Sequence, residues 1–194
     1  DYSSRVKFVH CDVTNWNDQV KLFRTAASMT PSNTIDHVVA NAGIAIEDEV
    51  FSYEGTHLSD SKNLGTIKTL THAKQPGPEY PPQPPNLKTI DVNLHGALYT
   101  TKLALHTFIK QNGSEGPSKS HQKDTSLTLI GSGAAFLDCP RGVQYQSTKW
   151  GIRGIMHALR RMVHYHGSRV NMNRLGEYMF SYLCPTRGHG RSPS

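Results

Sequence analysis

The sequence has few cysteines and no long apolar run. Its 194 residues include three cysteines, Cys11, Cys139 and Cys184, which are far apart. This number and spacing exclude a disulfide framework and the Cys and Cys/His motifs of a zinc site, so we expect reduced thiols and no metal. No segment reaches the roughly 18 consecutive apolar residues of a membrane helix, and no signal peptide is apparent. We therefore expect a cytoplasmic protein without a membrane partner.

Acidic residues are also in the minority. The chain has 21 lysines and arginines against 15 aspartates and glutamates, which gives a net charge of +6. An excess of basic residues suggests that the protein could bind nucleic acid. The basic residues are spread along the chain, however, and no basic stripe is interleaved with aromatic side chains that could stack on bases. We therefore expect no nucleic-acid partner.

Strand and helix patterns alternate along the chain. Short apolar and β-branched runs predict strands, and apolar residues at helical spacing predict helices. The predicted strands cover 6–12, 35–43, 126–132 and 168–172, and the predicted helices cover 16–28, 87–110 and 144–165. The segment 44–86 ends in many prolines, so we expect an exposed loop with at most one short helix. This alternation predicts an α/β protein with a parallel sheet and crossover helices.

The segment "YQSTK" at 145–149 carries two residues that suggest acid/base chemistry. Tyr145 and Lys149 are four residues apart in a predicted helix and therefore share one face. A phenol titrates too high for efficient proton transfer at neutral pH, and a neighbouring ammonium lowers its pKa. The spacing alone occurs by chance in many chains, so two ordinary residues on one helical face remain an alternative.

Two further polar residues strengthen this interpretation. Ser132 follows a predicted strand, and ligands of parallel sheets bind at the carboxyl ends of the strands. Asn93 lies within the amphipathic helix predicted at 87–110, where a buried polar side chain is costly unless it is satisfied or used. The alternatives are a serine in an ordinary turn and an asparagine bonded to a backbone carbonyl.

Together these segments resemble the short-chain dehydrogenase/reductase family, classical type. The residues that carry the resemblance are "CDVTN" at 11–15, "ANAG" at 40–43, "DVNLHG" at 91–96, "LIGSGAA" at 129–135, "YQSTK" at 145–149 and "RVN" at 169–171. They occur in the order and spacing of the family, over roughly 6–171. The proline-rich loop and the polar composition are similar to fungal secondary-metabolism members of the hydroxyaverantin dehydrogenase type.

The resemblance implies an NAD(P)-dependent oxidoreductase that interconverts a secondary alcohol and a ketone by hydride transfer. It implies that Tyr145 is the general acid/base, that Lys149 lowers the tyrosine pKa and binds the nicotinamide ribose, and that Ser132 holds the substrate oxygen. Asn93, through a local helix irregularity, would hold a water that links Lys149 to solvent. The cofactor, NAD or NADP, would also contact Asp12, Val13, Asn41, Ala42 and Gly43. Family members are often homodimers or homotetramers through the helices at 87–110 and 144–165.

The chain departs from the family pattern at both ends. No G-x-x-x-G-x-G turn for the cofactor pyrophosphate occurs, and the sequence begins at the third strand of the family. We therefore expect an incomplete Rossmann-like, doubly wound α/β/α sheet over 1–172 that lacks the first two strands and the C-terminal end. Strand 6–12 would then have no neighbour unless it moved beside 36–41. Residues 173–194 form a divergent tail, for which disorder is one interpretation. The alternative function is a catalytically dead fragment without cofactor binding.

Overall fold

The computed structural model describes residues 5–46, 50, 84–113, 124–139 and 142–174. Three parallel strands form one sheet in the order β1-β2-β3, with β1 at His37–Ala40, β2 at Thr125–Ile130 and β3 at Ser168–Asn173. The strands predicted within 35–43, 126–132 and 168–172 are thereby confirmed. The proline-rich region predicted as a loop falls largely outside the described residues.

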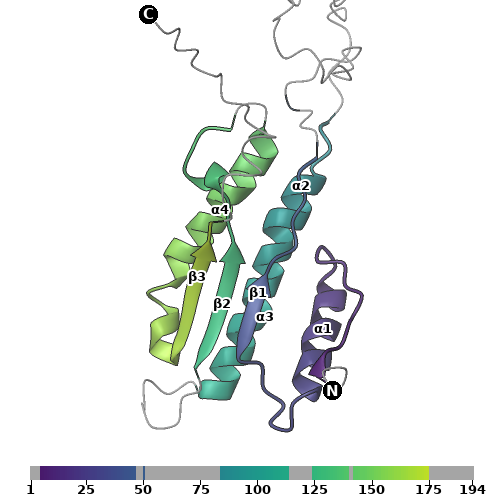
Figure 1. Ribbon diagram of the computed structural model, residues 1–194, viewed down its shortest axis with the longest axis vertical. Helices are drawn as coiled ribbons and strands as arrows, with labels where there is room; N and C mark the ends of the chain where they lie inside the picture. The colour runs from purple at the N-terminus through teal and green to yellow at the C-terminus, as the bar shows by residue number, and fades with distance from the viewer. Residues whose placement is uncertain (1–4, 47–49, 51–83, 114–123, 140–141, 175–194) are drawn as a thin grey trace, which may run out of the picture.

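Three long helices lie on one side of this sheet; the second and third cover its face, and the first packs beside the second, beyond the edge strand β1 (Figure 1). They are α1 at Trp16–Ser28, α3 at Gly96–Asn112 and α4 at Val143–Leu159. A short helix α2 at Lys88–Ile90 and a π-helical turn η3 at Asp91–His95 lead directly into α3, and the 3-10 turns η4 at Gly133–Ala135 and η5 at Val163–His166 complete the elements. The described residues thus show one sheet layer and one helix layer of the expected Rossmann-like α/β architecture.

The hydrophobic core lies between the sheet and these helices. Alternate residues of β2 point inward, and Leu127 and Leu129 are fully buried against Phe108 of α3 and Ile152 of α4. The other face of the sheet is more open, and Val39 of β1 is 57% exposed there. A strand with one buried face shows this alternation because successive side chains point to opposite faces.

The helix α1 begins where its sequence predicts. Asn15 is its N-cap, and its side-chain oxygen accepts hydrogen bonds from the backbone N–H groups of Asn17 (2.9 Å) and Asp18 (3.3 Å). An asparagine cap satisfies backbone donors that have no partner within the helix. The cap fixes the point at which the chain turns from the segment before it into α1.

The prediction of a strand at 6–12 is wrong. These residues form no strand in the structure, and Val6 and Phe8 are 74% and 88% exposed. A β-branched sequence becomes a strand only when another strand pairs with it, because its preference comes from packing on a pleated surface. Within the described residues the sheet ends at β1, so 6–12 has no partner, as the sequence led us to expect unless it moved beside 36–41.

Candidate active site

Tyr145 and Lys149 lie one turn apart on the face of α4 that is turned toward the core. Both side chains are buried, with 5% and 7% of their surface exposed. The Lys149 Nζ lies 5.5 Å from the centre of the Tyr145 ring and donates a hydrogen bond to the Ile130 carbonyl (3.0 Å). The predicted helical spacing therefore brings the pair together at the end of β2.

Burial governs the protonation of this pair. Burial raises the pKa of Tyr145. The Ser132 hydroxyl opposes part of this rise, and Cys139 adds to it. Burial also lowers the pKa of Lys149. The expected lowering of the tyrosine pKa by the Lys149 ammonium is wrong for this arrangement, because burial disfavours both charged forms and is the largest influence on each group. The structure thus favours a protonated phenol.

Ser132 lies just beyond the carboxyl end of β2, facing Tyr145. Its backbone is extended (φ −160°, ψ 165°), and its hydroxyl accepts a hydrogen bond from the Ala134 N–H (3.2 Å), which caps the turn η4. The Tyr145 ring packs against Ala134 and Cys139. The Tyr145 hydroxyl is buried, and although the Ser132 hydroxyl lies near enough to lower its pKa, it makes no well-formed hydrogen bond within the described residues. A buried hydroxyl without a partner is unfavourable, and this one lies at the edge of a parallel sheet where ligands bind.

Asn93 lies in the π-helical turn η3, which confirms the expected helix irregularity. The side chain is 2% exposed, and its Oδ1 accepts a hydrogen bond from the Ile44 N–H (2.7 Å) while its Nδ2 donates to the Ile44 carbonyl (2.8 Å). A longer contact reaches the Thr148 hydroxyl on α4 (3.4 Å). Asn93 thus fastens the segment after β1 beside the helix that carries Tyr145 and Lys149.

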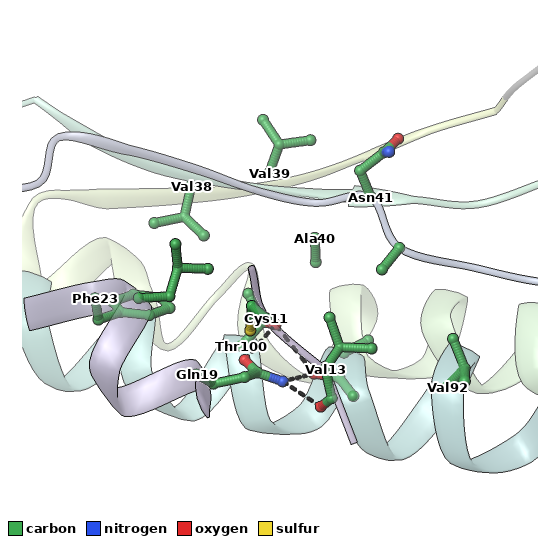
Figure 2. A pocket seen from close by; sticks show the side chains of 14 residues that line it. Cys11, Val13, Gln19, Phe23, Val38, Val39, Ala40, Asn41, Val92 and Thr100 are labelled. Carbon is green, nitrogen blue, oxygen red and sulfur yellow. Dashed lines mark hydrogen bonds between the residues drawn. The ribbon is translucent and has the colours of Figure 1, made fainter. Parts of the chain in front are cut away.

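A cavity of about 170 Å³ brings together three of the five other predicted cofactor residues. Figure 2 shows Val38 and Ala40 of β1 pointing toward the segment that carries Cys11 and Val13, whereas the Asn41 amide points to the other side of the strand. Val13 and Asn41 both line the cavity. Ala42 also lines the cavity. Most of the lining is apolar, as the walls of ligand sites are in general. The cavity therefore joins two segments that the sequence assigned to the same ligand.

The two remaining predicted cofactor residues lie outside this cavity. Asp12 is exposed, and its carboxylate accepts hydrogen bonds from the Thr14 N–H (2.9 Å) and hydroxyl (2.8 Å), which lower the pKa of Asp12. Gly43 lies against Asn93, where an added Cβ would stand 3.3 Å from Asn93 Oδ1. Asp12 therefore shapes the turn before α1, and Gly43 allows the close approach of the amide.

Gln19 is a buried residue of this region that the sequence interpretation missed. It is 1% exposed, and its Nε2 donates to the carbonyls of Val13 (2.5 Å) and Gly96 (3.0 Å), while its Oε1 accepts from the Thr100 hydroxyl (2.8 Å). Figure 2 shows the amide of Gln19 beside Val13, with a dashed line to its carbonyl. Gln19 links α1, the Val13 segment and α3, and so fixes one wall of the cavity.

Gly96 and Gly154 offer a matched pair of substitutions that tests this wall. A Cβ at Gly96 would lie 2.9 Å from Val13 Cγ2, whereas nothing lies within 4 Å of one at Gly154. We expect Gly96→Ala to lower the free energy of unfolding by about 1–2 kcal/mol, because overpacking exceeds the gain in helix propensity. Gly154→Ala should raise it by about 0.5–1 kcal/mol. Urea denaturation measures both, and shifts of the same sign would contradict the close packing of Gly96 on Val13.

The described part of the chain offers neither a membrane-spanning helix nor a metal-binding cluster. No helix there is both long and apolar enough to cross a bilayer. No group of three His, Cys, Asp or Glu side chains there is arranged to hold a metal ion.

The fold and the site define an incomplete Rossmann-like α/β protein. A model of the family described as short chain dehydrogenase matches residues 1–179. The chain therefore belongs to the short-chain dehydrogenase family.

Its relatives include fungal enzymes of secondary metabolism. The chain is 30% identical over 168 residues to the 5'-hydroxyaverantin dehydrogenase of Dothistroma septosporum, covering 86% of this chain and 48% of the relative. It is 29% identical over 167 residues to the 5'-hydroxyaverantin dehydrogenase of Emericella nidulans, covering 85% and 49%. The chain is thus of the fungal hydroxyaverantin dehydrogenase type and spans about half the length of these relatives.

Solved structures show the same fold. A short-chain dehydrogenase from Novosphingobium aromaticivorans superimposes with a TM-score of 0.62 at 16% identity, covering 89% of this chain and 51% of that chain. A tyrosine-to-phenylalanine variant of ElxO with NADPH bound gives a TM-score of 0.60 at 18% identity, covering 89% and 53%. These likenesses place the chain in the Rossmann-like fold of the family.

Proposed function

We propose that this protein interconverts a secondary alcohol and a ketone by NAD(P)-dependent hydride transfer, with Tyr145 as the general acid/base. The observation that carries the proposal is the buried Tyr145 hydroxyl, which has no hydrogen-bond partner in the described residues and faces Ser132 at the end of β2. A substrate oxygen placed there would satisfy both hydroxyl groups. Because burial raises the pKa of Tyr145, the phenol is protonated at neutral pH and can donate a proton when a ketone is reduced.

The residues of the site fit the two ends of a nicotinamide dinucleotide. The apolar cavity between Val13 and Asn41–Ala42 suits the flat adenine end, and the buried ammonium of Lys149 is a hydrogen-bond donor for the nicotinamide ribose. NAD or NADP, when bound, supplies the hydride chemistry. Asp12 and Gly43 would support the adenosine end only indirectly, through the turn before α1 and the position of Asn93.

The chain's own residues would divide the remaining work. Ser132 would hold the substrate oxygen by a hydrogen bond, and Tyr145 would exchange a proton with that oxygen. Asn93 would keep the segment after β1 at its place beside α4 through its two bonds to Ile44. The predicted water between Asn93 and Lys149 would replenish the proton from solvent. The exposed apolar residues Leu98 on α3 and Trp150 on α4 favour the predicted homodimer or homotetramer through these helices.

Cofactor binding tests the proposal without knowledge of the substrate. Titration of purified protein with NADH and with NADPH, followed by nicotinamide fluorescence, should give saturable binding below millimolar concentration, and the tighter of the two identifies the preferred cofactor. We expect weak binding by this polypeptide, because its sequence contains no G-x-x-x-G-x-G motif for the pyrophosphate. If neither titration saturates, the proposal fails, and a chain that keeps the catalytic residues without holding a cofactor becomes the better description. The first alcohol to test is 5'-hydroxyaverantin, which gives two of the relatives their names.

A further inference from the structure

The helix α4 holds the chain on both sides of Ser132. Tyr145, Lys149 and Arg153 follow one another at intervals of four residues and therefore share a face of the helix. Lys149 Nζ donates to the Ile130 carbonyl (3.0 Å), two residues before Ser132. Arg153 Nη1 donates to the Ala135 carbonyl (3.1 Å), three residues after it. Two cationic side chains thus bind the two ends of the segment that carries the serine.

The Arg153 guanidinium is also held between two aromatic rings. Its Cζ lies 4.4 Å from the ring centre of Phe136, in the turn after Ser132, and 5.2 Å from that of Trp150, on its own helix. A planar guanidinium can stack on aromatic faces and donate a directed hydrogen bond at the same time, which an ammonium cannot do. The contacts therefore fix the direction of the turn as well as its distance from α4.

The other contacts of this turn are less directional. Ala134 and Ala135 are buried, but burial of methyl groups is not directional. Phe136 is 40% exposed, and besides Arg153 only the more distant Arg174 guanidinium (Cζ 5.9 Å from the ring centre) lies over its ring among the described residues. The hydrogen bonds from the Ala135 N–H to the Ser132 carbonyl (3.1 Å) and from the Phe136 N–H to the Gly133 carbonyl (2.9 Å) shape the turn internally. They do not orient it relative to Tyr145. The Gln146 amide on α4 binds the chain further on, where it donates to the Leu137 carbonyl (3.0 Å) and accepts from the Cys139 N–H (3.2 Å), so Arg153 is the α4 residue that binds the turn itself, at Ala135 and Phe136.

We propose that Arg153 is a positioning residue that holds the turn after β2, and with it the Ser132 hydroxyl, in front of Tyr145. Arg153 acts through the Ala135 carbonyl and the Phe136 ring and does not itself contact the reacting groups. Its effect on turnover rests on the proposed function, whereas its effect on the turn does not. The two effects are therefore measured separately.

Hydrogen–deuterium exchange of the apo protein tests the effect on the turn. In Arg153→Ala the amides of 134–137 should exchange roughly tenfold faster, as expected for the loss of one charge-assisted hydrogen bond. Arg153→Lys should lie in between, because it keeps a donor and loses the stacking.

Absorbance titration, with Tyr145→Phe for assignment, should show a further rise of the Tyr145 pKa in Arg153→Ala, because Ser132 would no longer oppose the effect of burial. A merely structural arginine would leave this titration unchanged.

Arg161→Ala is the matched control, since it removes the same charge from an exposed position just beyond α4. In turnover, Arg153→Ala should lower kcat roughly tenfold with an unchanged KM for the cofactor. If Arg153→Ala shows the same amide exchange and the same Tyr145 titration as Arg161→Ala, the proposal is overturned. If Arg153→Ala does not fold, Arg153→Lys decides by the same two measurements. If no variant turns over substrate but Arg153→Ala still exchanges faster, the result counts against the proposed function and supports the positioning role.

Discussion

Replacement of Tyr145 by phenylalanine is expected to abolish turnover while the protein stays folded and binds cofactor. The change removes one hydroxyl, which makes no hydrogen bond in the described structure, and it leaves the ring packed against Ala134 and Cys139. No buried partner is therefore left unsatisfied, and the free energy of unfolding should change little or rise. Loss of a general acid/base should slow the reaction by roughly 10²–10⁴-fold. Steady-state rates, cofactor titration and urea denaturation measure the three effects.

Tyr99→Phe is the matched control for this substitution. Tyr99 lies on α3, is 36% exposed and contacts Trp16 edge to face at 5.4 Å between ring centres. Its hydroxyl has no place in the proposed mechanism, so the control should keep the rate of the unsubstituted protein. A Tyr145→Phe protein that retains more than about a tenth of that rate would show that proton transfer does not depend on this phenol.

Replacement of Asn93 by alanine is expected to be the most destabilising change within the site. Its two bonds to Ile44 satisfy a partly buried backbone N–H and C=O, which alanine would leave without a protein partner. The expected loss in the free energy of unfolding is about 2–4 kcal/mol, from the penalty for unpaired buried groups. Because 41–44 would lose its attachment to the π-helical turn, cofactor affinity should fall as well. Urea denaturation and the NADH and NADPH titrations measure the two losses.

Asn171→Ala provides the comparison, because Asn171 is exposed on β3 and the change should move stability by less than about 0.5 kcal/mol. Asn93→Asp should recover part of the loss, since a carboxylate still accepts from the Ile44 N–H but cannot donate to its carbonyl. Equal stability of Asn93→Ala and Asn171→Ala would contradict the role of the amide in fastening the segment after β1.

The sequence predicts those parts of the fold that local patterns determine. Asn15 followed by apolar residues at helical spacing defines α1, and the short apolar runs before Asn41 and Gly131 define β1 and β2. The segment 6–12 has an equally good strand pattern and yet forms no strand, because strand formation needs a partner that the pattern does not reveal.

The candidate site shows the same limit. Tyr145 and Lys149 meet because four residues make one helical turn, and Ser132 joins them because it follows a strand of the same parallel sheet. Gln19 could not be found in this way, since its hydrogen bond to the Gly96 carbonyl joins residues 77 positions apart in the sequence. The pKa of Tyr145 was also beyond reach, because its direction depends on how deeply the phenol is buried.

The most direct test of the proposed chemistry is the transfer of a labelled hydride. The protein would be incubated with NAD or NADP and with 5'-hydroxyaverantin that carries deuterium on the carbon of its 5'-hydroxyl group. We predict that mass spectrometry finds the deuterium in the reduced cofactor, and that Tyr145→Phe yields none at the same cofactor saturation. Oxidised product without deuterium in the cofactor, or equal transfer by Tyr145→Phe, would contradict hydride transfer assisted by Tyr145.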